Sequence, residues 1–388
     1  MIHKTTRSIL SVLLAALLLV TSIPLTPAFA GEEGAVSLQS ESGESEGLKP
    51  AADGTYLIYT AENLKEFAAI VNGTHAEVAR NNSANARLMN NIVLNEKIEV
   101  DDNGAVTNQE GLSEWIPIGS DSSRYSGTFD GNNYTISGLY IDSSSANDQG
   151  LFGYVGIVGT VQNLSVSGTV SGGTYVGGVV GQNNGNVEDC DFTGSVTGSG
   201  KYVGGVVGYN GDISTVENCC NTGAVSGGEC VGGVVGLNSG TVENCYNTGT
   251  VTGTDDYVGG VVGQSFSASV TNSYNTGEVS GTDDYVGGVV GWNDSGNVTG
   301  CYFLQTETVN TQLQGIGSDS GSGSATPLSA EAFESQEKFT SWDFAKTWKI
   351  ESIFGRPTLK ANAEIGGTAN NPYKIFTATQ LENFRDLV

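Results

Sequence analysis

The chain has 388 residues, of which 56 are glycine and only 15% are charged, and its formal net charge is −26 at pH 7. So acidic a chain repels other polyanions, which excludes nucleic acid and anionic lipid surfaces as expected partners. It has six cysteines but no Cys-x-x-Cys pair, and only two histidines, which excludes a zinc site built on the usual ligand spacings.

Residues 1–30 have the pattern of a secretory signal peptide. Lys4 and Arg7 precede the apolar run Ile9 to Val20, and small residues lead to a cleavage site after Ala30. A membrane anchor is the alternative, but the run is short for a bilayer span, and no other stretch is apolar enough to cross one. We therefore expect a secreted, extracellular protein held at the cell surface by regions beyond this sequence.

The next segments are expected to lead into a folded domain. Residues 31–50 are rich in Glu, Ser and Gly, which favours a disordered linker. Residues 51–114 are predicted to form an amino-terminal cap and the first strands, with a strand from Tyr56 and an amphipathic helix that begins after Thr60. The apolar face of that helix carries Leu64, Phe67, Ala68 and Val71. Such a helix would cover unpaired backbone groups at the open end of a sheet.

A repeat of 27 to 28 residues fills the chain from Gly150 to Cys301. Its clearest copies read Tyr-Val-Gly-Gly-Val-Val-Gly, with cysteine for tyrosine in one copy, and begin at positions 175, 202, 230, 257 and 285. The second glycine of each pair recurs at 150, 178, 205, 233, 260 and 288. So regular a period predicts stacked structural units rather than a globular domain around one central site.

Each unit holds three short β-branched runs separated by Gly, Asn or Asp, such as Val231 to Leu237, Val242 to Tyr246 and Thr250 to Thr252. These runs are too short and too rich in glycine for helices. They predict an all-β fold, a right-handed parallel β-helix over residues 115–305. We interpret Gly177-Gly178 as a tight bend with φ > 0. A nucleotide-binding glycine loop is excluded, because it would occur once and precede a helix.

These repeats resemble the GLUG motif of secreted bacterial surface proteins. Gly150-Leu151-Phe152-Gly153 has its four-residue core, and Val242 to Gly249 reads Val-Glu-Asn-Cys-Tyr-Asn-Thr-Gly. The resemblance covers residues 115–305 and departs from the motif by valine for leucine in the later copies. It implies a β-helical stalk or binding surface, as in adhesin-like proteins and the non-catalytic parts of IgA-cleaving metallopeptidases, but by itself no activity.

The carboxyl-terminal part is predicted to close the module and to begin another. Residues 306–328 are expected to be a Gly/Ser-rich linker, and residues 329–362 an aromatic closing segment. Tyr373 to Val388 then matches Tyr56 to Val71 with a constant offset of 317 residues (373 minus 56). We therefore expect residues 363–388 to be the truncated start of a second module.

Two acidic pairs, Asp255-Asp256 and Asp283-Asp284, stand one coil apart at the same repeat position. Stacking would bring four carboxylates together, which could hold calcium, a hard cation that takes oxygen ligands. Solvated turns are the preferred interpretation, because the earlier coils lack the pair. Calcium is thus the one candidate cofactor, and these aspartates are the one candidate metal site.

The cysteines fall into two groups. One repeat position holds a cysteine in four coils and Ser273 in a fifth. Residues stacked in register on successive coils lie about 4.8 Å apart, which is wider than the Cβ separation of a disulfide, so buried thiols are expected. The four are Cys190, Cys219, Cys245 and Cys301. Cys220 and Cys230 instead replace aromatic residues of other coils, and a compensating bridge between them is a second hypothesis.

Polar and aromatic positions also recur. Asn218, Asn244, Asp189 and Asn272 occupy one position and are expected to form a polar ladder at a corner of the coil. The recurring tyrosines are expected to pack at corners, with an exposed stripe for glycan stacking as the alternative.

Catalytic residues are not found in this sequence. HExxH is absent, and Lys201 is the only Lys or Arg between Gly150 and Cys301, which removes the base of a lyase. Asp255 and Asp283 remain a minor candidate for the pair of carboxylates that a glycosidase needs. We predict a non-enzymatic surface protein, a rigid stalk or adhesin-like binding module for host or environmental glycans or proteins. The alternative is a non-catalytic region of a larger extracellular peptidase or glycan-active enzyme.

Overall fold

A computed structural model describes residues 47–99, 106–282, 285–351 and 355–360, which belong to one compact unit. The predicted signal peptide, most of the predicted linker and the predicted second module at 363–388 lie outside the described residues.

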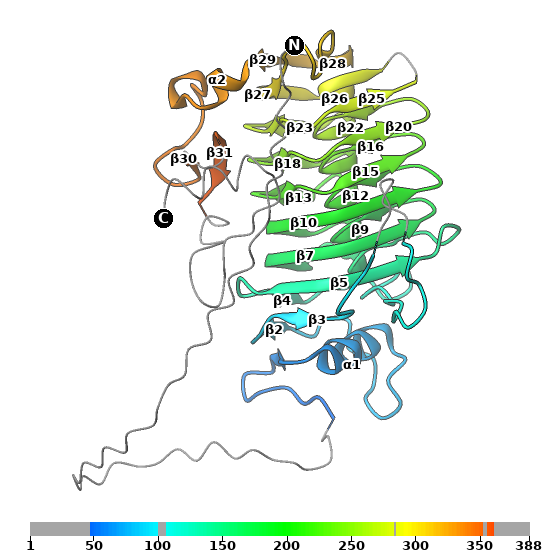
Figure 1. Ribbon diagram of the computed structural model, residues 1–388. Helices are drawn as coiled ribbons and strands as arrows, with labels where there is room; N and C mark the ends of the chain where they lie inside the picture. Colours follow the sequence, from blue (N-terminus) through cyan, green and yellow to red (C-terminus); the bar gives the residue numbers. More distant parts are fainter. Residues whose placement is uncertain (1–46, 100–105, 283–284, 352–354, 361–388) are drawn as a thin grey trace, which may run out of the picture. The chain divides into compact units, whose positions relative to one another are not determined.

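The coils stack through one unbroken column of parallel strands (Figure 1). Each strand pairs in register with the next, roughly one repeat later along the chain. The predicted all-β parallel β-helix is confirmed, with about nine turns. In stacking order the column is β1 (Tyr56–Ile58), β2 (Ala86–Leu88), β4 (Thr128–Asp130), β7 (Thr160–Gly172), β10 (Asn186–Gly198), β13 (Thr215–Glu217), β18 (Thr241–Glu243), β23 (Ser269–Thr271), β27 (Asn297–Leu304) and β29 (Ser322–Leu328).

Shorter strands complete the same sheet. They are β3 (Ile92–Val93), β5 (Thr135–Asp142), β14 (Cys220–Asn221), β15 (Ala224–Gly227), β19 (Tyr246–Asn247), β20 (Val251–Gly253), β24 (Tyr274–Asn275) and β25 (Val279–Gly281).

A second parallel sheet forms the opposite side of the coils from Phe152 onward. Its main strands are β6 (Phe152–Val155), β9 (Val180–Asn183), β12 (Val207–Asn210), β17 (Val235–Asn238), β22 (Val262–Phe266), β26 (Val286–Asp294) and β28 (Gln314–Asp319). A two-residue strand precedes four of them: β8 (Val176–Gly177), β11 (Val203–Gly204), β16 (Val231–Gly232) and β21 (Val258–Gly259).

Valines from both sheets fill the interior of the coils. In one coil Val203, Val207 and Val216 are fully buried. The glycine pair lets neighbouring coils approach: a Cβ on Gly205 would lie 2.2 Å from the carbonyl oxygen of Gly233 in the next coil. The predicted bend with φ > 0 at Gly177-Gly178 is wrong, because the residue with positive φ is the tyrosine before the pair.

The amino-terminal cap forms as predicted. Helix α1 (Ala61–Asn72) begins after Thr60, whose Oγ1 accepts a hydrogen bond from Asn63 N at 3.2 Å, and it ends at Gly73 in the left-handed conformation. Its buried face contains the four predicted residues and Ile70. The helix lies at one end of the stack, beside β2 and β3 (Figure 1).

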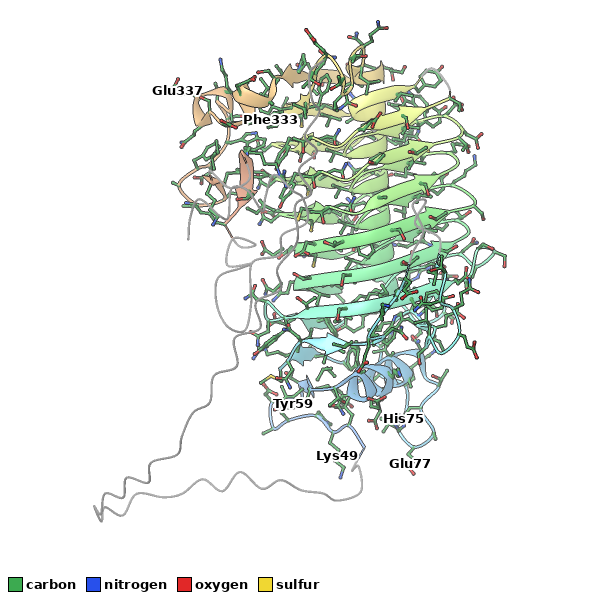
Figure 2. All side chains as sticks on the ribbon, viewed as in Figure 1. Lys49, Tyr59, His75, Glu77, Phe333 and Glu337 are labelled. Atoms are coloured by element: carbon green, nitrogen blue, oxygen red, sulfur yellow. The ribbon has the colours of Figure 1, made fainter. Side chains whose placement is uncertain are left out.

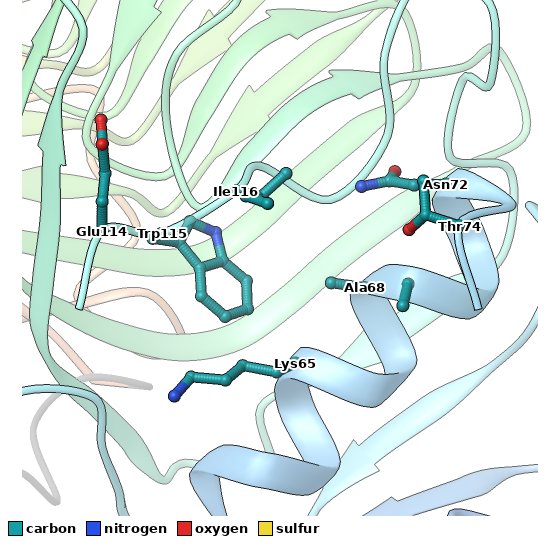
Figure 3. Close-up of a pocket in the computed structure, with 8 residues that line it drawn as sticks. Lys65, Ala68, Asn72, Thr74, Glu114, Trp115 and Ile116 are labelled. Carbon is teal, nitrogen blue, oxygen red and sulfur yellow. The ribbon is translucent and has the colours of Figure 1, made fainter. Parts of the chain in front are cut away.

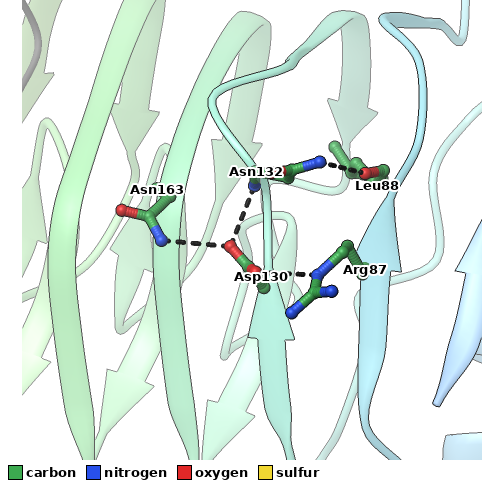
Figure 4. A network of polar contacts seen from close by, with 5 residues as sticks. All are labelled: Arg87, Leu88, Asp130, Asn132 and Asn163. Carbon is green, nitrogen blue, oxygen red and sulfur yellow. Dashed lines mark hydrogen bonds and ion pairs between the residues drawn. The ribbon is translucent and has the colours of Figure 1, made fainter.

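Asp130 ties three successive coils together (Figure 4). Its carboxylate accepts hydrogen bonds from Arg87 Nε and Asn163 Nδ2, each at 3.0 Å. It also accepts one from the N–H of Asn132, whose side chain donates to Leu88 O at 3.2 Å. Burial alone would raise the pKa of Asp130, but these hydrogen bonds and the charge of Arg87 outweigh it and lower that pKa.

The carboxyl-terminal predictions need two corrections. Most of the predicted linker at 306–328 is not a linker: β28 and β29, within residues 314–328, pair in parallel with β26 and β27 and form a further coil. Gly and Ser fit the backbone of a coil as well as that of a linker. The closing segment packs against the side of the stack rather than across its end. It holds α2 (Ala330–Phe333), a short 3₁₀ helix (Gln336–Lys338) and the antiparallel pair β30 (Trp348–Glu351) and β31 (Arg356–Leu359). Phe333 is buried there, while Glu337 is exposed (Figure 2).

Candidate functional site

One corner of the coil is held by residues that strain the backbone. Tyr175, Tyr202, Cys230 and Tyr257 have φ between 57° and 68°, and each stands just before the short strand of its coil. Asp148 occupies the same place one coil earlier, with φ of 58°. A tyrosine in this left-handed region is a genuine outlier. We call these residues, with Tyr285, the corner column.

A second row of side chains runs beside the corner column on the outer face of the second sheet. Its members lie in register from strand to strand. They are Tyr154, Gln182, Tyr209, Leu237, Gln264 and Trp292, and we call them the face column.

The two columns contact each other along a regular diagonal. Four contacts join a corner residue to a face residue 34 or 35 positions later: Asp148 to Gln182, Tyr175 to Tyr209, Cys230 to Gln264 and Tyr257 to Trp292. Gln182 Nε2 donates to Asp148 Oδ1 at 2.5 Å, and the rings of Tyr257 and Trp292 stack at 4.8 Å. The two columns therefore form one continuous surface, the aromatic stripe.

Rings gather in two clusters on this stripe. In the first, Tyr175 stacks on Tyr202 at 5.2 Å and lies 5.9 Å from Tyr209. In the second, Tyr257 lies 5.3 Å from Tyr285 and 4.8 Å from Trp292. These rings are half-buried, and Tyr285 is exposed. Between the clusters stand Cys230 and Leu237, which carry no ring.

Another corner of the same coils shows how this backbone conformation is usually accommodated. There the positions with positive φ hold residues that tolerate it, and none holds a ring: Asn163, Asp189, Asn218, Asn244, Asn272 and Gly300. The predicted polar position is therefore a corner, as expected. A residue kept in a strained backbone conformation, where another residue type would adopt that conformation without strain, points to a functional role.

Polar groups border the first cluster. Arg124 lies over the ring of Tyr154 at 4.5 Å and pairs with Asp121 at 2.6 Å, and Asn184 Nδ2 donates to Tyr154 Oη at 2.7 Å. Burial raises the pKa of Asp148, and the hydrogen bond from Gln182 offsets part of that rise. Neutral and acidic groups thus dominate this end of the stripe.

A second tyrosine position of the repeat is covered. Tyr246, Tyr274 and Tyr302 stack along the first sheet beneath the closing segment. Tyr274 is fully buried, its Oη donates to Pro357 O at 2.6 Å, and its ring lies 6.0 Å from that of Trp348. Packing, the expected role of the tyrosines, describes this covered column, although its members lie in strands and not at a corner. The tyrosines at the corner are the half-exposed ones of the aromatic stripe.

Comparisons with known proteins match this architecture. A family model described as the GLUG motif matches residues 172–197, 227–252 and 256–280, three of the six repeat copies. These three stretches are GLUG motifs. A crystal structure from Bacteroides ovatus, described as a "putative immunoglobulin A1 protease", superposes with a TM-score of 0.59 over 80% of this chain and 94% of that chain. At 22% identity, this likeness shows the fold alone.

Two sequence relatives share only short parts with the chain. Halomucin of Haloquadratum walsbyi is 36% identical over 142 residues, which is 36% of this chain and 2% of halomucin. A "Putative Gly-rich membrane protein" of Evansella cellulosilytica is 40% identical over 79 residues, 19% of this chain and 9% of that protein. The chain thus spans a small fraction of either relative. Within the described residues, no helix is both long and apolar enough to cross a membrane.

The acidic pair Asp255-Asp256, at the start of the third GLUG motif, lies directly before Tyr257 of the stripe. Asp255 is exposed and Asp256 half-buried in the turn before Tyr257, while Asp283 and Asp284 lie outside the described residues. The described part of the chain holds no group of three or more His, Cys, Asp or Glu side chains placed to bind a metal ion. The calcium hypothesis therefore stays a prediction.

The cysteine column of the repeat consists of buried thiols, as predicted. Each Sγ donates to the carbonyl oxygen two residues earlier, at 3.1 Å in Cys219 and Cys245, and Ser273 makes the same bond at 2.8 Å. The predicted bridge is wrong: Cys220 and Cys230 are both thiols. Cys220 stacks in register with Tyr246 under the closing segment, whereas Cys230 contacts Gln264 on the stripe.

Two buried asparagine stacks inside the GLUG coils were not anticipated. Asn183 donates to Asn210, and Asn210 to Asn238, each at 2.9 Å. Asn221 donates in the same way to Asn247, and Asn247 to Asn275. Each of these asparagines except Asn210 also donates a hydrogen bond to the carbonyl oxygen of the glycine two residues later. Asn210 instead accepts a hydrogen bond from the hydroxyl of Ser214. The recurrence of Asn two residues before Gly in most coils was the available signal.

A small pocket of about 200 Å³ lies between α1 and the segment before Ile118 (Figure 3). Its polar lining already has partners: Asn72 bonds to Pro117 O at 3.0 Å and Gly119 N at 2.8 Å, and Trp115 Nε1 donates to Leu151 O at 3.0 Å. The pocket therefore belongs to the packing of the cap rather than to a site.

Proposed function

We propose that this chain is a non-enzymatic binding module of an extracellular surface protein, in which the β-helix is a rigid support and the aromatic stripe contacts the partner. One observation carries the proposal: the corner column keeps tyrosines in a strained conformation, although Asn, Asp or Gly would fit there without strain. Half-exposed rings on a rigid frame supply contact area at low entropic cost.

The residues around the stripe support binding rather than catalysis. Lys201 is the only Lys or Arg between Gly150 and Cys301, and it forms an ion pair with Glu229 at 2.6 Å. A lyase base would have to come from elsewhere. An extracellular location is supported by the signal-like pattern of residues 1–30.

The second candidate is a non-catalytic region of a larger extracellular peptidase or glycan-active enzyme. The match to the Bacteroides ovatus structure over 94% of that chain favours it. Both candidates give the stripe the same role, and they differ in what lies beyond the sequence.

A binding screen tests the proposal. Purified protein would be applied to glycan and extracellular-protein arrays beside the double variant Tyr202→Asn/Trp292→Ala, and beside Glu307→Gln as a matched surface control away from the stripe. We expect wild type and control to share a set of partners that the double variant loses. Identical partner sets for all three proteins would contradict the proposal.

A further inference from the structure

We propose that the aromatic stripe binds one neutral, linear polysaccharide chain that lies along the axis of the β-helix and contacts both ring clusters. This inference rests on the proposed function, because it names the ligand of the same surface.

Each cluster contains two rings that stack on each other, so its open surface consists of the outer ring face and the ring edges. Tyr175 and Tyr202 are inclined by only 21° to each other, and Tyr257 and Trp292 by 27°. The C–H face of a pyranose ring is flat and apolar, so it can be buried against such rings while its hydroxyls stay hydrated at the edge. A stacked pair at each cluster can hold one or more sugar units.

The spacing of the clusters matches a polymer rather than a single sugar. The short strands after Tyr175 and Tyr257 are separated by three parallel steps, from Val176 through Val203 and Val231 to Val258. At about 4.8 Å for each step, the two clusters lie about 14 Å apart. A ligand that reaches both gains from the effective concentration of its second contact.

The corner position between the two clusters carries no ring. Cys230 stands where the neighbouring coils have tyrosine, and its thiol turns to Gln264 at 3.3 Å. A tyrosine at 230 would raise a ring between the clusters. Cys230 therefore separates the two clusters, because it is the corner position between Tyr202 and Tyr257 that carries no ring.

The charges along the stripe favour a neutral ligand. Two cations in the described part of the chain lie near the stripe, and each pairs with an acid: Arg124 with Asp121 and Lys201 with Glu229, both at 2.6 Å. Asp148 and Asp256 add negative charge at the two clusters. Sulfated and uronic-acid polymers would be repelled, whereas Gln182 and Gln264 can bond to hydroxyl groups. Repeated flat rings also suit a repeating sugar better than a cationic peptide.

Calorimetric titration with neutral cello-, xylo-, manno- and chito-oligosaccharides, from disaccharide to octasaccharide, tests the inference. In at least one series, affinity is expected to rise steeply once the ligand reaches both clusters. Tyr202→Asn and Trp292→Ala should each weaken the longest ligand by about tenfold. Cys230→Tyr should strengthen the binding of long ligands, because it adds a ring in register between Tyr202 and Tyr257, and Glu307→Gln should change nothing.

Several outcomes would overturn the inference. These are no binding in any neutral series, affinity that does not depend on length, or tighter binding of hyaluronan, heparin or poly-lysine. If stripe variants abolish binding of such a charged ligand or of a protein, the proposed function stands and only the neutral polysaccharide is lost. If neutral sugars bind but stripe variants do not affect them, both proposals fail.

Discussion

The repeat places tyrosine in two columns, of which one is covered by the closing segment and the other is half-exposed. Tyr246, Tyr274 and Tyr302 lie under the closing segment and contact its buried aromatic residues. Tyr175, Tyr202 and Tyr257 stand at a strained corner and keep part of their rings exposed. Both columns are equally regular in the sequence, so periodicity alone does not separate packing from function.

The backbone conformation of the tyrosines distinguishes the two columns. The covered tyrosines lie in or beside ordinary strands, and their burial accounts for them. The corner tyrosines have positive φ, which costs an L-residue about 1–2 kcal/mol. Burial explains the first column, whereas the second is maintained against a local conformational preference.

The largest expected effect comes from the covered column. Tyr274→Ala should lower the free energy of unfolding by about 3–5 kcal/mol, because it empties a fully buried site beneath Trp342 and Trp348 and removes the hydrogen bond to Pro357. Tyr202→Ala should cost less than about 1.5 kcal/mol, the worth of one ring pair. Urea unfolding followed by tryptophan fluorescence measures both; equal losses would remove the distinction between the columns.

The sequence predicted the fold well because the fold is periodic. Glycine spacing, β-branched runs and turn residues repeat with every coil, so one correct assignment extends to the rest. The amino-terminal helix was predictable for another reason, since Thr60 and Gly73 are strong local end signals. The linker prediction was wrong for residues 314–328, because Gly and Ser occur equally well in an irregular coil of the β-helix and in a linker.

The site was less accessible to prediction. Positive φ at Tyr175 could not be read from a sequence in which the adjacent Gly177-Gly178 offered the more usual explanation. The diagonal contact between Tyr257 and Trp292 depends on the path of the chain between coils. Cys230 was linked with Cys220 because both replace aromatic residues, although they lie on different faces.

A smaller effect, with a pH dependence, is expected at the relaxed corner. Burial raises the pKa of Asp189 to about 6, from 3.8. Because the folded-state pKa is the higher one, the charged carboxylate destabilises the fold at pH 7, and this penalty disappears as the pH falls through about 6 toward 3.8. Asp189→Asn, which introduces the residue found at 218, 244 and 272, should therefore stabilise the protein at pH 7.

The gain from Asp189→Asn should be at most about 1–2 kcal/mol, since solvent screens a carboxylate that is partly exposed. It should vanish near pH 4. Urea unfolding of wild type and variant between pH 7 and pH 4 measures this difference; a gain that stays constant across that range would show that charge is not its cause.

The smallest effect on stability is expected from Tyr202→Asn, a variant that should weaken binding by about tenfold. Tyr202→Asn replaces a strained ring by a residue that tolerates positive φ, so relief of about 1 kcal/mol offsets the lost stack on Tyr175, worth about 0.5–1.5 kcal/mol. The free energy of unfolding should change by less than about 1 kcal/mol, as Asp148 at the same position of an earlier coil suggests. The same substitution at Tyr274, which is fully buried, should be strongly destabilising. If Tyr202→Asn destabilised the protein as much as Tyr274→Asn, the corner tyrosines would be structural after all, and the case for a binding role would lose its basis.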